Sequence, residues 1–268
     1  MEKVELMSAK NLGHLDQGVS RRPLQDQRVV IVGGTSGMGL GSARAAAEAG
    51  AEVIVVGRRP ESSRKSSSAE DSHFKHATAD VTNEASVRAL FEGIDHFDHL
   101  LITAAPASGP FLGDFAKQDL TKAQGYMNAK FFGSWLCARY AAPKIRSNGS
   151  ITFLTGCSVI HPHLGGSMIT ATFAALEAFS RVLALEMGPL RVNTIRPGLV
   201  ESECWNFLEK PVRDKFFENA RAIMPVRRIG SIQDIGHCAV FIMTNPYISG
   251  TTIEVSGGET LVSLKEPV

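Results

Sequence analysis

The sequence lacks the features that usually accompany metal centres, disulfides, nucleic acids or membranes. Its 268 residues include only four cysteines, which lie far apart and indicate neither a zinc site nor a disulfide framework. The 28 basic and 27 acidic residues give a net charge of +1, which attracts neither nucleic acid nor an anionic membrane. Residues 1–27 lack the apolar run of a signal peptide, and no other apolar stretch reaches spanning length. We therefore expect a soluble, cytoplasmic protein without nucleic-acid or membrane partners.

Metal-binding residue types cluster once, in residues 95–99 (DHFDH). This segment lies between a predicted helix and a predicted strand, so that two of its side chains are expected to face water. We therefore predict no metal site.

The hydrophobic pattern indicates one large α/β domain. Residues 1–26 are polar and aperiodic, which predicts an N-terminal arm, and residues 27–268 are long enough for a single core. From residue 27 onward, β-branched runs alternate with helical segments, and no internal repeat is present. This alternation favours right-handed crossovers, and hence a Rossmann-like, doubly wound parallel sheet in a three-layer αβα arrangement. The predicted strands are residues 28–34, 51–57, 74–81, 97–105, 149–156, 191–198 and 251–258.

A glycine-rich loop, VGGTSGMGLG, separates the first strand from the first helix. Glycine permits the tight turn and lets backbone N–H groups and the helix N-terminus approach a pyrophosphate. Because the loop follows a buried strand and opens a helix, it predicts nucleotide binding.

The spacing of Gly33, Gly37 and Gly39 resembles the loop of the short-chain dehydrogenase/reductase family, with Val32 in place of that family's usual Thr. Asp80 and Val81 resemble its adenine contact, and "RVNTIRPGLVES" resembles its nicotinamide-side segment. The resemblance covers residues 27–262 and implies a nicotinamide cofactor. The cofactor positions that it implies are Gly33, Thr35, Ser36, Gly37, Met38, Gly39, Asp80, Val81, Ala104, Ala105, Pro197, Gly198, Val200 and Ser202.

The end of the second strand favours NADP(H) over NAD(H). An NAD site usually places an acid there for the ribose 2′-OH, whereas a 2′-phosphate needs cationic partners. Here Gly57 stands near the acid's position, and Arg58 and Arg59 follow it directly. Arginine binds phosphate with two parallel hydrogen bonds, so we predict NADP(H).

The catalytic residues that the resemblance implies are absent. The family uses a Ser, a Tyr-x-x-x-Lys pair on the helix after the fifth strand, and an Asn on the preceding long helix. Alignment through "AALEAFSRVLALE" places Ile169 at the Tyr position and Phe173 at the Lys position. The Ser position falls at Gly156 or Cys157, and Lys130 stands in place of the Asn. No tyrosine occurs between residues 140 and 247, so no shift of this helix restores the pair.

Three interpretations of these substitutions remain open. The chain reduces an apolar C=N⁺ (iminium) or C=O group without the tyrosine, as some family members of alkaloid pathways do, because an iminium ion needs hydride but no proton. Alternatively, another acid protonates a carbonyl product, and the candidates are Lys130, His161, His163 and Glu203. In the third interpretation, the fold binds nucleotide without redox turnover, or the bound cofactor shapes a cavity for a cyclisation or pericyclic step.

The substrate pocket is expected to be unusually apolar, which favours a bulky apolar substrate. The residues predicted to line it are Pro106, Cys157, Ile169, Phe173 and Trp205. The helices predicted near residues 119–147 and 167–187 carry more apolar positions than one buried stripe requires. We therefore predict a homodimer or homotetramer.

Overall fold

The computed structural model describes residues 22–59, 71–106 and 111–263. Within them, seven parallel strands form one sheet in the order β3-β2-β1-β4-β5-β6-β7. The strands are β1 (Arg28–Val32), β2 (Glu52–Gly57), β3 (Lys75–Thr78), β4 (Phe97–Ile102), β5 (Ile145–Leu154), β6 (Arg191–Pro197) and β7 (Thr252–Val255). Strands β2 and β3 are added on one side of β1, and β4 to β7 on the other, so the strand order reverses between β1 and β4. Doubly wound sheets bind ligands at such a switch point.

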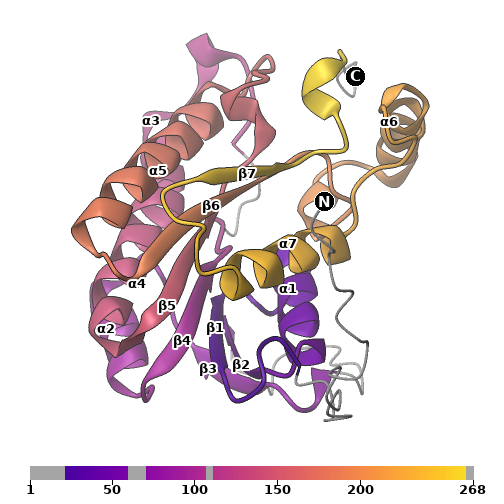
Figure 1. Cartoon of the computed structure of the whole chain (residues 1–268). Coiled ribbons are helices and arrows are strands. Elements are labelled where there is room, and N and C mark those ends of the chain that lie inside the picture. Colours follow the sequence, from indigo (N-terminus) through magenta and orange to yellow (C-terminus); the bar gives the residue numbers. More distant parts are fainter. Residues whose placement is uncertain (1–21, 60–70, 107–110, 264–268) are drawn as a thin grey trace, which may run out of the picture.

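Helices cover both faces of the sheet (Figure 1), which confirms the predicted three-layer arrangement. Helices α1 (Gly37–Glu48) and α7 (Ile232–Thr244) pack on one face, and α2 (Glu84–Glu92), α4 (Gly133–Ala141) and α5 (Ser167–Glu186) pack on the other. The central strands β1 and β4 are almost completely buried because both faces are covered. Helix α6 (Lys210–Ile223) stands apart near the carboxyl ends of the strands.

The folded unit begins before the predicted boundary at residue 27. Leu24 is fully buried in the core beside α1, and its N–H group donates to the carbonyl oxygen of Ala49. Residues 22–26 therefore belong to the domain, whereas residues 1–21 of the predicted arm lie outside the described residues.

The predicted continuous helix over residues 119–147 is wrong in two respects. It consists of α3 (Leu120–Met127), a π-helical turn (Asn128–Phe132) and α4, followed by a short 3₁₀ turn (Ala142–Lys144). Strand β5 then starts at Ile145, four residues earlier than predicted, and its register with β4 shifts near Phe97. Gly149 follows this irregularity, and a β-carbon there would overlap the carbonyl oxygen of Asp98.

The prediction that no apolar stretch reaches membrane-spanning length is wrong for helix α5. Its 20 residues and mean hydropathy of 1.5 suffice by length and composition. In the structure it covers the sheet, with Leu176 fully buried and Glu177 paired with Arg196 of β6 at 2.9 Å. Its apolar composition is therefore that of a helix packed on the sheet core.

Candidate active site

The glycine loop between β1 and α1 forms a close-fitting turn. Gly33 has a φ of +88°, a conformation that favours glycine. A β-carbon on Gly39 would overlap the carbonyl oxygen of Gly33 and lie 2.6 Å from Thr103 Oγ1. The N-terminus of α1 thus lies directly against the end of β1, and its free N–H groups suit a pyrophosphate. A side chain at Gly39 would disrupt this turn, so glycine there keeps the N-terminus of α1 in the position that suits a dinucleotide pyrophosphate.

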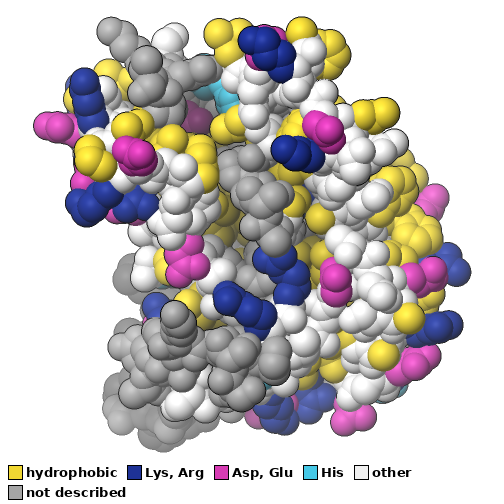
Figure 2. Space-filling model, turned by 180° about the vertical axis from the view of Figure 1, so that it is seen from behind, with side chains coloured by type: hydrophobic (Ala, Val, Ile, Leu, Met, Phe, Trp, Pro, Cys, Tyr) yellow, Lys and Arg dark blue, Asp and Glu magenta, His cyan; other side chains and the backbone are white. Residues whose placement is uncertain are grey.

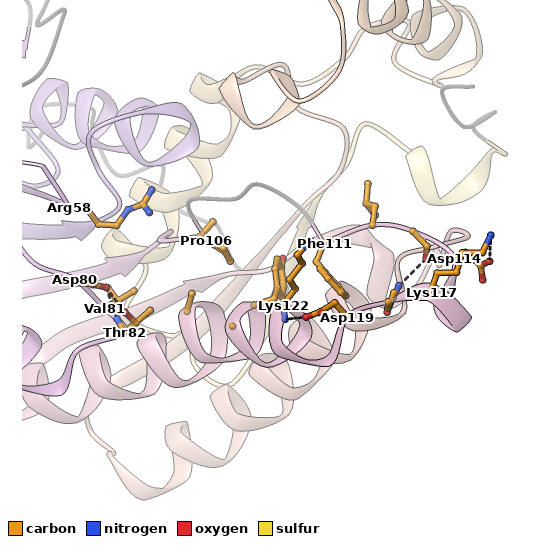
Figure 3. Close-up of a pocket in the computed structure, with 17 residues that line it drawn as sticks. Arg58, Asp80, Val81, Thr82, Pro106, Phe111, Asp114, Lys117, Asp119 and Lys122 are labelled. Carbon is orange, nitrogen blue, oxygen red and sulfur yellow. Dashed lines mark hydrogen bonds and ion pairs between the residues drawn. The ribbon is translucent and has the colours of Figure 1, made fainter.

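The end of β2 supplies a cation instead of an acid. The strand ends at Gly57, and Arg58 lines a cavity opposite Asp80, Val81 and Thr82 (Figure 3). The Asp80 carboxylate accepts hydrogen bonds from Thr82 Oγ1 at 2.7 Å and Thr82 N at 2.9 Å. These bonds, and then the charge of Arg58, lower the pKa of Asp80. The carboxylate is therefore already engaged, which leaves Arg58 as the charged group available to a ligand phosphate.

The same cavity, of about 770 Å³, extends from Arg58 past Ala105 and Pro106 at the end of β4 toward α3. Figure 3 shows Phe111 above the helix and Pro106 between it and the Arg58 end. The remaining lining residues are Leu112, Gly113, Asp114, Lys117, Gln118, Asp119, Lys122, Gly125, Tyr126 and Ala129. Of the residues predicted to contact substrate, Pro106 lines this cavity, whereas Cys157, Ile169, Phe173 and Trp205 do not.

Helix α5 presents apolar side chains at the positions where the resemblance implies a Tyr and a Lys. Ile169 is 6% exposed, and the Phe173 ring lies against Gly156, where a β-carbon would stand 2.8 Å from Phe173 Cε2. Cys157 is buried, and burial raises the pKa of its thiol to about 12. Ser158 is also buried, and its hydroxyl has no hydrogen-bond partner among the described residues. None of the ionisable groups on this wall titrates near neutral pH.

Lys130 brings a cation to this wall from the opposite helix. Its side chain is 3% exposed, and Nζ donates a hydrogen bond to the carbonyl oxygen of Ala104 at 3.2 Å. Nζ also lies 5.9 Å from the centre of the Phe173 ring. Burial lowers the pKa of Lys130 to about 8. Asn128, two residues earlier, is exposed, which confirms that it is out of phase with Lys130.

We call residues 198–223, the segment after β6 together with α6, the lid. Its first turn brings Ser202 to the glycine loop, because a β-carbon on Gly37 would lie 3.8 Å from Ser202 Cβ. Val200 is buried, and Glu259 accepts a hydrogen bond from the N–H group of Leu199. These contacts hold the segment after Pro197 against the site.

The chain matches the model of a family described as enoyl-(acyl carrier protein) reductase over residues 32–260. It belongs to the short-chain dehydrogenase/reductase family.

Curated relatives in this family align along most of the chain. The short-chain dehydrogenase/reductase ucsE of Acremonium sp. is 27% identical over 266 residues, covering 89% of this chain and 97% of the relative. The short-chain dehydrogenase/reductase malC of Malbranchea aurantiaca is 28% identical over 260 residues, covering 90% and 97%. Family membership therefore rests on the whole fold and not on the glycine loop alone.

Solved structures agree with this assignment. A small-chain dehydrogenase in complex with NADPH is 31% identical, with a TM-score of 0.76 over 88% of this chain and 99% of that one. The MalC reductase/Diels-Alderase of Malbranchea aurantiaca is 25% identical, with a TM-score of 0.79 over 91% and 100%. The predicted fold is thereby confirmed, and the chain shares it with nicotinamide-dependent oxidoreductases.

The structure brings together most of the residues predicted for the cofactor. The loop residues Thr35, Ser36 and Met38 lie at the start of α1, and Ala104 and Ala105 follow β4 beside the cavity. Pro197 and Gly198 end β6, as predicted. Arg59 is exposed and does not line the cavity, so its contact with a cofactor stays a prediction.

His161 and His163 lie within electrostatic reach of Glu259. Burial raises the pKa of Glu259, and these two histidines act electrostatically on that carboxylate to lower it. His163 is exposed, and its Nδ1 lies 3.2 Å from the carbonyl oxygen of Leu164. Neither histidine lines the described cavity, and their role as acids stays a prediction. The candidate acid Glu203 is exposed in the lid.

Trp205 was predicted to contact substrate, but it packs inside the lid. Its ring contacts Phe207, Phe216 and Phe217 at centroid distances of 6.0, 5.4 and 5.9 Å. Its Nε1 donates to the carbonyl oxygen of Val200 at 3.0 Å. Trp205 thus joins α6 to the segment after β6 in a small hydrophobic cluster of its own.

Replacement of Trp205 by phenylalanine is expected to loosen the lid selectively. The substitution keeps an aromatic ring but removes the hydrogen bond to Val200, which is worth about 1 kcal/mol. Amide hydrogen exchange in α6 should therefore accelerate about fivefold, while exchange in the sheet strands stays unchanged. Uniform acceleration throughout the domain would show that Trp205 stabilises the whole fold instead.

Sequence reasoning missed one residue of the site, Tyr126. Tyr126 lies on α3 and lines the cavity, whereas the resemblance implies a tyrosine on α5. The sequence contained a signal, because Tyr126 and Lys130 in "YMNAK" repeat the Tyr-x-x-x-Lys spacing on a different helix.

Proposed function

We propose that this chain is an NADP(H)-dependent reductase of an apolar C=N⁺ or C=O substrate, with a non-standard active site. The observation that carries the proposal is the combination of the open glycine cradle and Arg58 with an α5 wall made of Ile169 and Phe173. The structural relative solved in complex with NADPH supports the same cofactor. The reduced nicotinamide supplies hydride when bound.

The protein's residues have distinct parts in this scheme. The glycine loop would hold the pyrophosphate and Arg58 the 2′-phosphate. The backbone of Val200 would contact the nicotinamide carboxamide, and Ser202 the cofactor phosphates. The apolar α5 wall excludes water from the electrophile and favours a bulky, hydrophobic substrate. An iminium carbon needs only hydride, so the wall requires no acid for that substrate class. We further propose a substrate from secondary, alkaloid-like metabolism, because the loss of the Tyr-x-x-x-Lys pair resembles that of family members in alkaloid pathways.

Lys130 extends the scheme to carbonyl substrates. Its ammonium group lies next to Phe173, at the place where the family's lysine would arise from α5. With a pKa of about 8, it stays mostly protonated at neutral pH and stabilises developing negative charge in a water-poor site. We therefore assign the missing cation to Lys130.

The test is NADPH binding, followed by turnover of an imine, iminium and ketone panel. Fluorescence of bound NADPH reports the cofactor, and loss of absorbance at the nicotinamide band reports reduction. Binding with turnover of one apolar class supports the reductase. Binding without any turnover favours a silent nucleotide-binding protein.

A second function is a cofactor-assisted cyclisation or cycloaddition. The MalC relative, described as a reductase/Diels-Alderase, and the cavity of about 770 Å³ favour it. In that case an apolar diene-containing probe would cyclise in the presence of NADP⁺ as well as NADPH, because no hydride is consumed.

The oligomeric state and location are further proposals. The side of the molecule formed by α3, α4 and α5 exposes Leu120 (71%), Phe132 (50%), Val182 (52%) and Leu185 (85%), and Figure 2 shows apolar side chains on that side. Leu176, in contrast, is buried within the chain and is not available to a partner. We propose a cytoplasmic homodimer or homotetramer, and a monomer by light scattering at micromolar concentration would oppose it.

A further inference from the structure

Tyr126 places a phenol in the cavity that the α5 wall cannot supply. It is the penultimate residue of α3, is 6% exposed, and lines the cavity with Gly125 and Ala129. Within the described part of the chain, its hydroxyl group has no hydrogen-bond partner. The phenol oxygen is not among the fully buried polar atoms that lack a partner, so it reaches the cavity, where a ligand can bond to it. The cavity is the place from which a partner can come.

The lid lies next to this phenol. Burial, and then the thiol of Cys204, raise the pKa of Tyr126. Cys204 Sγ lies 3.1 Å from Ser202 Oγ, and Ser202 reaches Gly37 of the glycine loop. Cys204 is therefore within electrostatic reach of Tyr126, and its neighbour Ser202 lies beside the glycine loop.

The helix around Tyr126 keeps it on the same face as Lys130. The two residues are four apart, and such residues share a helix face. The π-helical turn that starts at Asn128 follows directly, and such turns often occur at functional sites. Lys130 Nζ points to the carbonyl oxygen of Ala104, and burial is the cause of its altered pKa. The Lys130 ammonium group is thus engaged at the end of β4, whereas the Tyr126 phenol lines the cavity.

We propose that Tyr126 donates the proton to the oxygen of a carbonyl substrate in place of the missing α5 tyrosine. The inference rests on the reductase function proposed above and names its acid. The carbonyl carbon gains hydride from reduced nicotinamide, and the C=O electron pair moves to oxygen. That oxygen takes the Tyr126 proton to give an alcohol, and cavity water returns a proton to the phenolate.

Burial raises the pKa of Tyr126, so the phenol is protonated at neutral pH and can donate a hydrogen bond and a proton to a carbonyl oxygen. Iminium reduction does not involve the phenol at all.

The test compares Tyr126→Phe with the unaltered protein on two matched probes, tetralone and the N-methyl-dihydroisoquinolinium ion. The variant should lower kcat for tetralone about 100-fold, because positioned proton transfer contributes about 10²–10⁴-fold. Its kcat for the iminium ion should change less than threefold, and NADPH affinity should be unchanged. Tyr140→Phe is the control, since Tyr140 is hydrogen-bonded to Glu84 away from the cavity.

A binding measurement separates this inference from the reductase function. Equilibrium dialysis of the NADP⁺-loaded protein compares tetralone with tetralin, which lacks the carbonyl group. Tyr126→Phe should reduce the preference for tetralone about tenfold and leave tetralin binding unchanged. If the unaltered protein reduces neither probe but shows this loss of preference, the redox assignment fails and the Tyr126 contact stands. Equal losses of kcat on both probes, an unaffected tetralone rate, or an unchanged binding preference would overturn the inference.

Discussion

Replacement of Lys130 by methionine is expected to lower kcat for carbonyl reduction about 10²–10³-fold and to raise the melting temperature at the same time. The catalytic loss follows from removing a preorganised cation in a site with little water. The gain in stability follows because methionine has no charge to desolvate. The two effects are measured on one purified variant, by NADPH oxidation and by calorimetry.

The sign of the stability change follows from the pKa of Lys130. Burial lowers it from 10.5 to about 8, so between those values the folded protein binds fewer protons than the unfolded chain. Stability therefore rises as pH increases through this window, and below pH 8 the buried ammonium costs its full amount, about 3 kcal/mol. Loss of the hydrogen bond to Ala104 offsets about 1 kcal/mol of the gain. A net stabilisation of about 2 kcal/mol at pH 7 corresponds to roughly 5 °C.

The pH dependence of catalysis gives a second readout for Lys130. Because the ammonium form is required, kcat for a ketone should be level below pH 8 and fall about tenfold per pH unit above it. In Lys130→Met this limb should disappear. Lys144→Met is the matched control, since Lys144 Nζ donates to the carbonyl oxygen of Ile94 at the amino ends of β4 and β5, the edge of the sheet opposite the site. A variant at Lys130 that keeps its activity and loses stability would assign that lysine a structural role.

Replacement of Arg58 by alanine is expected to weaken NADPH binding about 100-fold and to change NADH binding less than threefold. Arg58 lines the cavity beyond Gly57, where an NAD site would carry an acid. Charge-assisted hydrogen bonds to a phosphate contribute about 1.5–3 kcal/mol each, and 2.7 kcal/mol corresponds to a factor of about 100. Fluorescence titration with both cofactors measures the ratio directly.

Two comparisons make the Arg58 experiment selective. NADH is the internal control, because it differs only in lacking the 2′-phosphate. Arg88→Ala removes an exposed arginine of α2 that does not line the cavity and should alter neither affinity. If Arg58→Ala lowers the affinity for NADPH and NADH equally, Arg58 stabilises the fold or contacts the adenosine instead of binding the 2′-phosphate.

The sheet and the phosphate loop were predictable because local signals decide them. Continuous β-branched runs such as "RVVIV" are typical of strands covered on both faces, and the glycine spacing has a steric cause at Gly39. Arg58 was equally readable, because the residue that follows a strand end points toward the same sheet edge as the ligand.

The interruptions of regular structure could not be predicted in the same way. The π-helical turn in "NAKFF" contains no proline or glycine, so nothing in its local sequence indicates a change of hydrogen-bond register. The early start of β5 depends on the close approach of Gly149 to Asp98, which is a contact between distant segments. The packing of Trp205 was not predictable either, because its partners Phe216 and Phe217 come from a helix whose packing the sequence does not specify.

The central claim is that this chain transfers hydride from NADPH although Ile169 and Phe173 replace the family's acid pair. Incubation with NADPH deuterated at the pro-S position of C4, followed by mass spectrometry of the products from the imine, iminium and ketone panel, tests it most directly. The account predicts a product with one deuterium on the former electrophilic carbon and a matching yield of unlabelled NADP⁺. Tight NADPH binding with no deuterium in any product would contradict it.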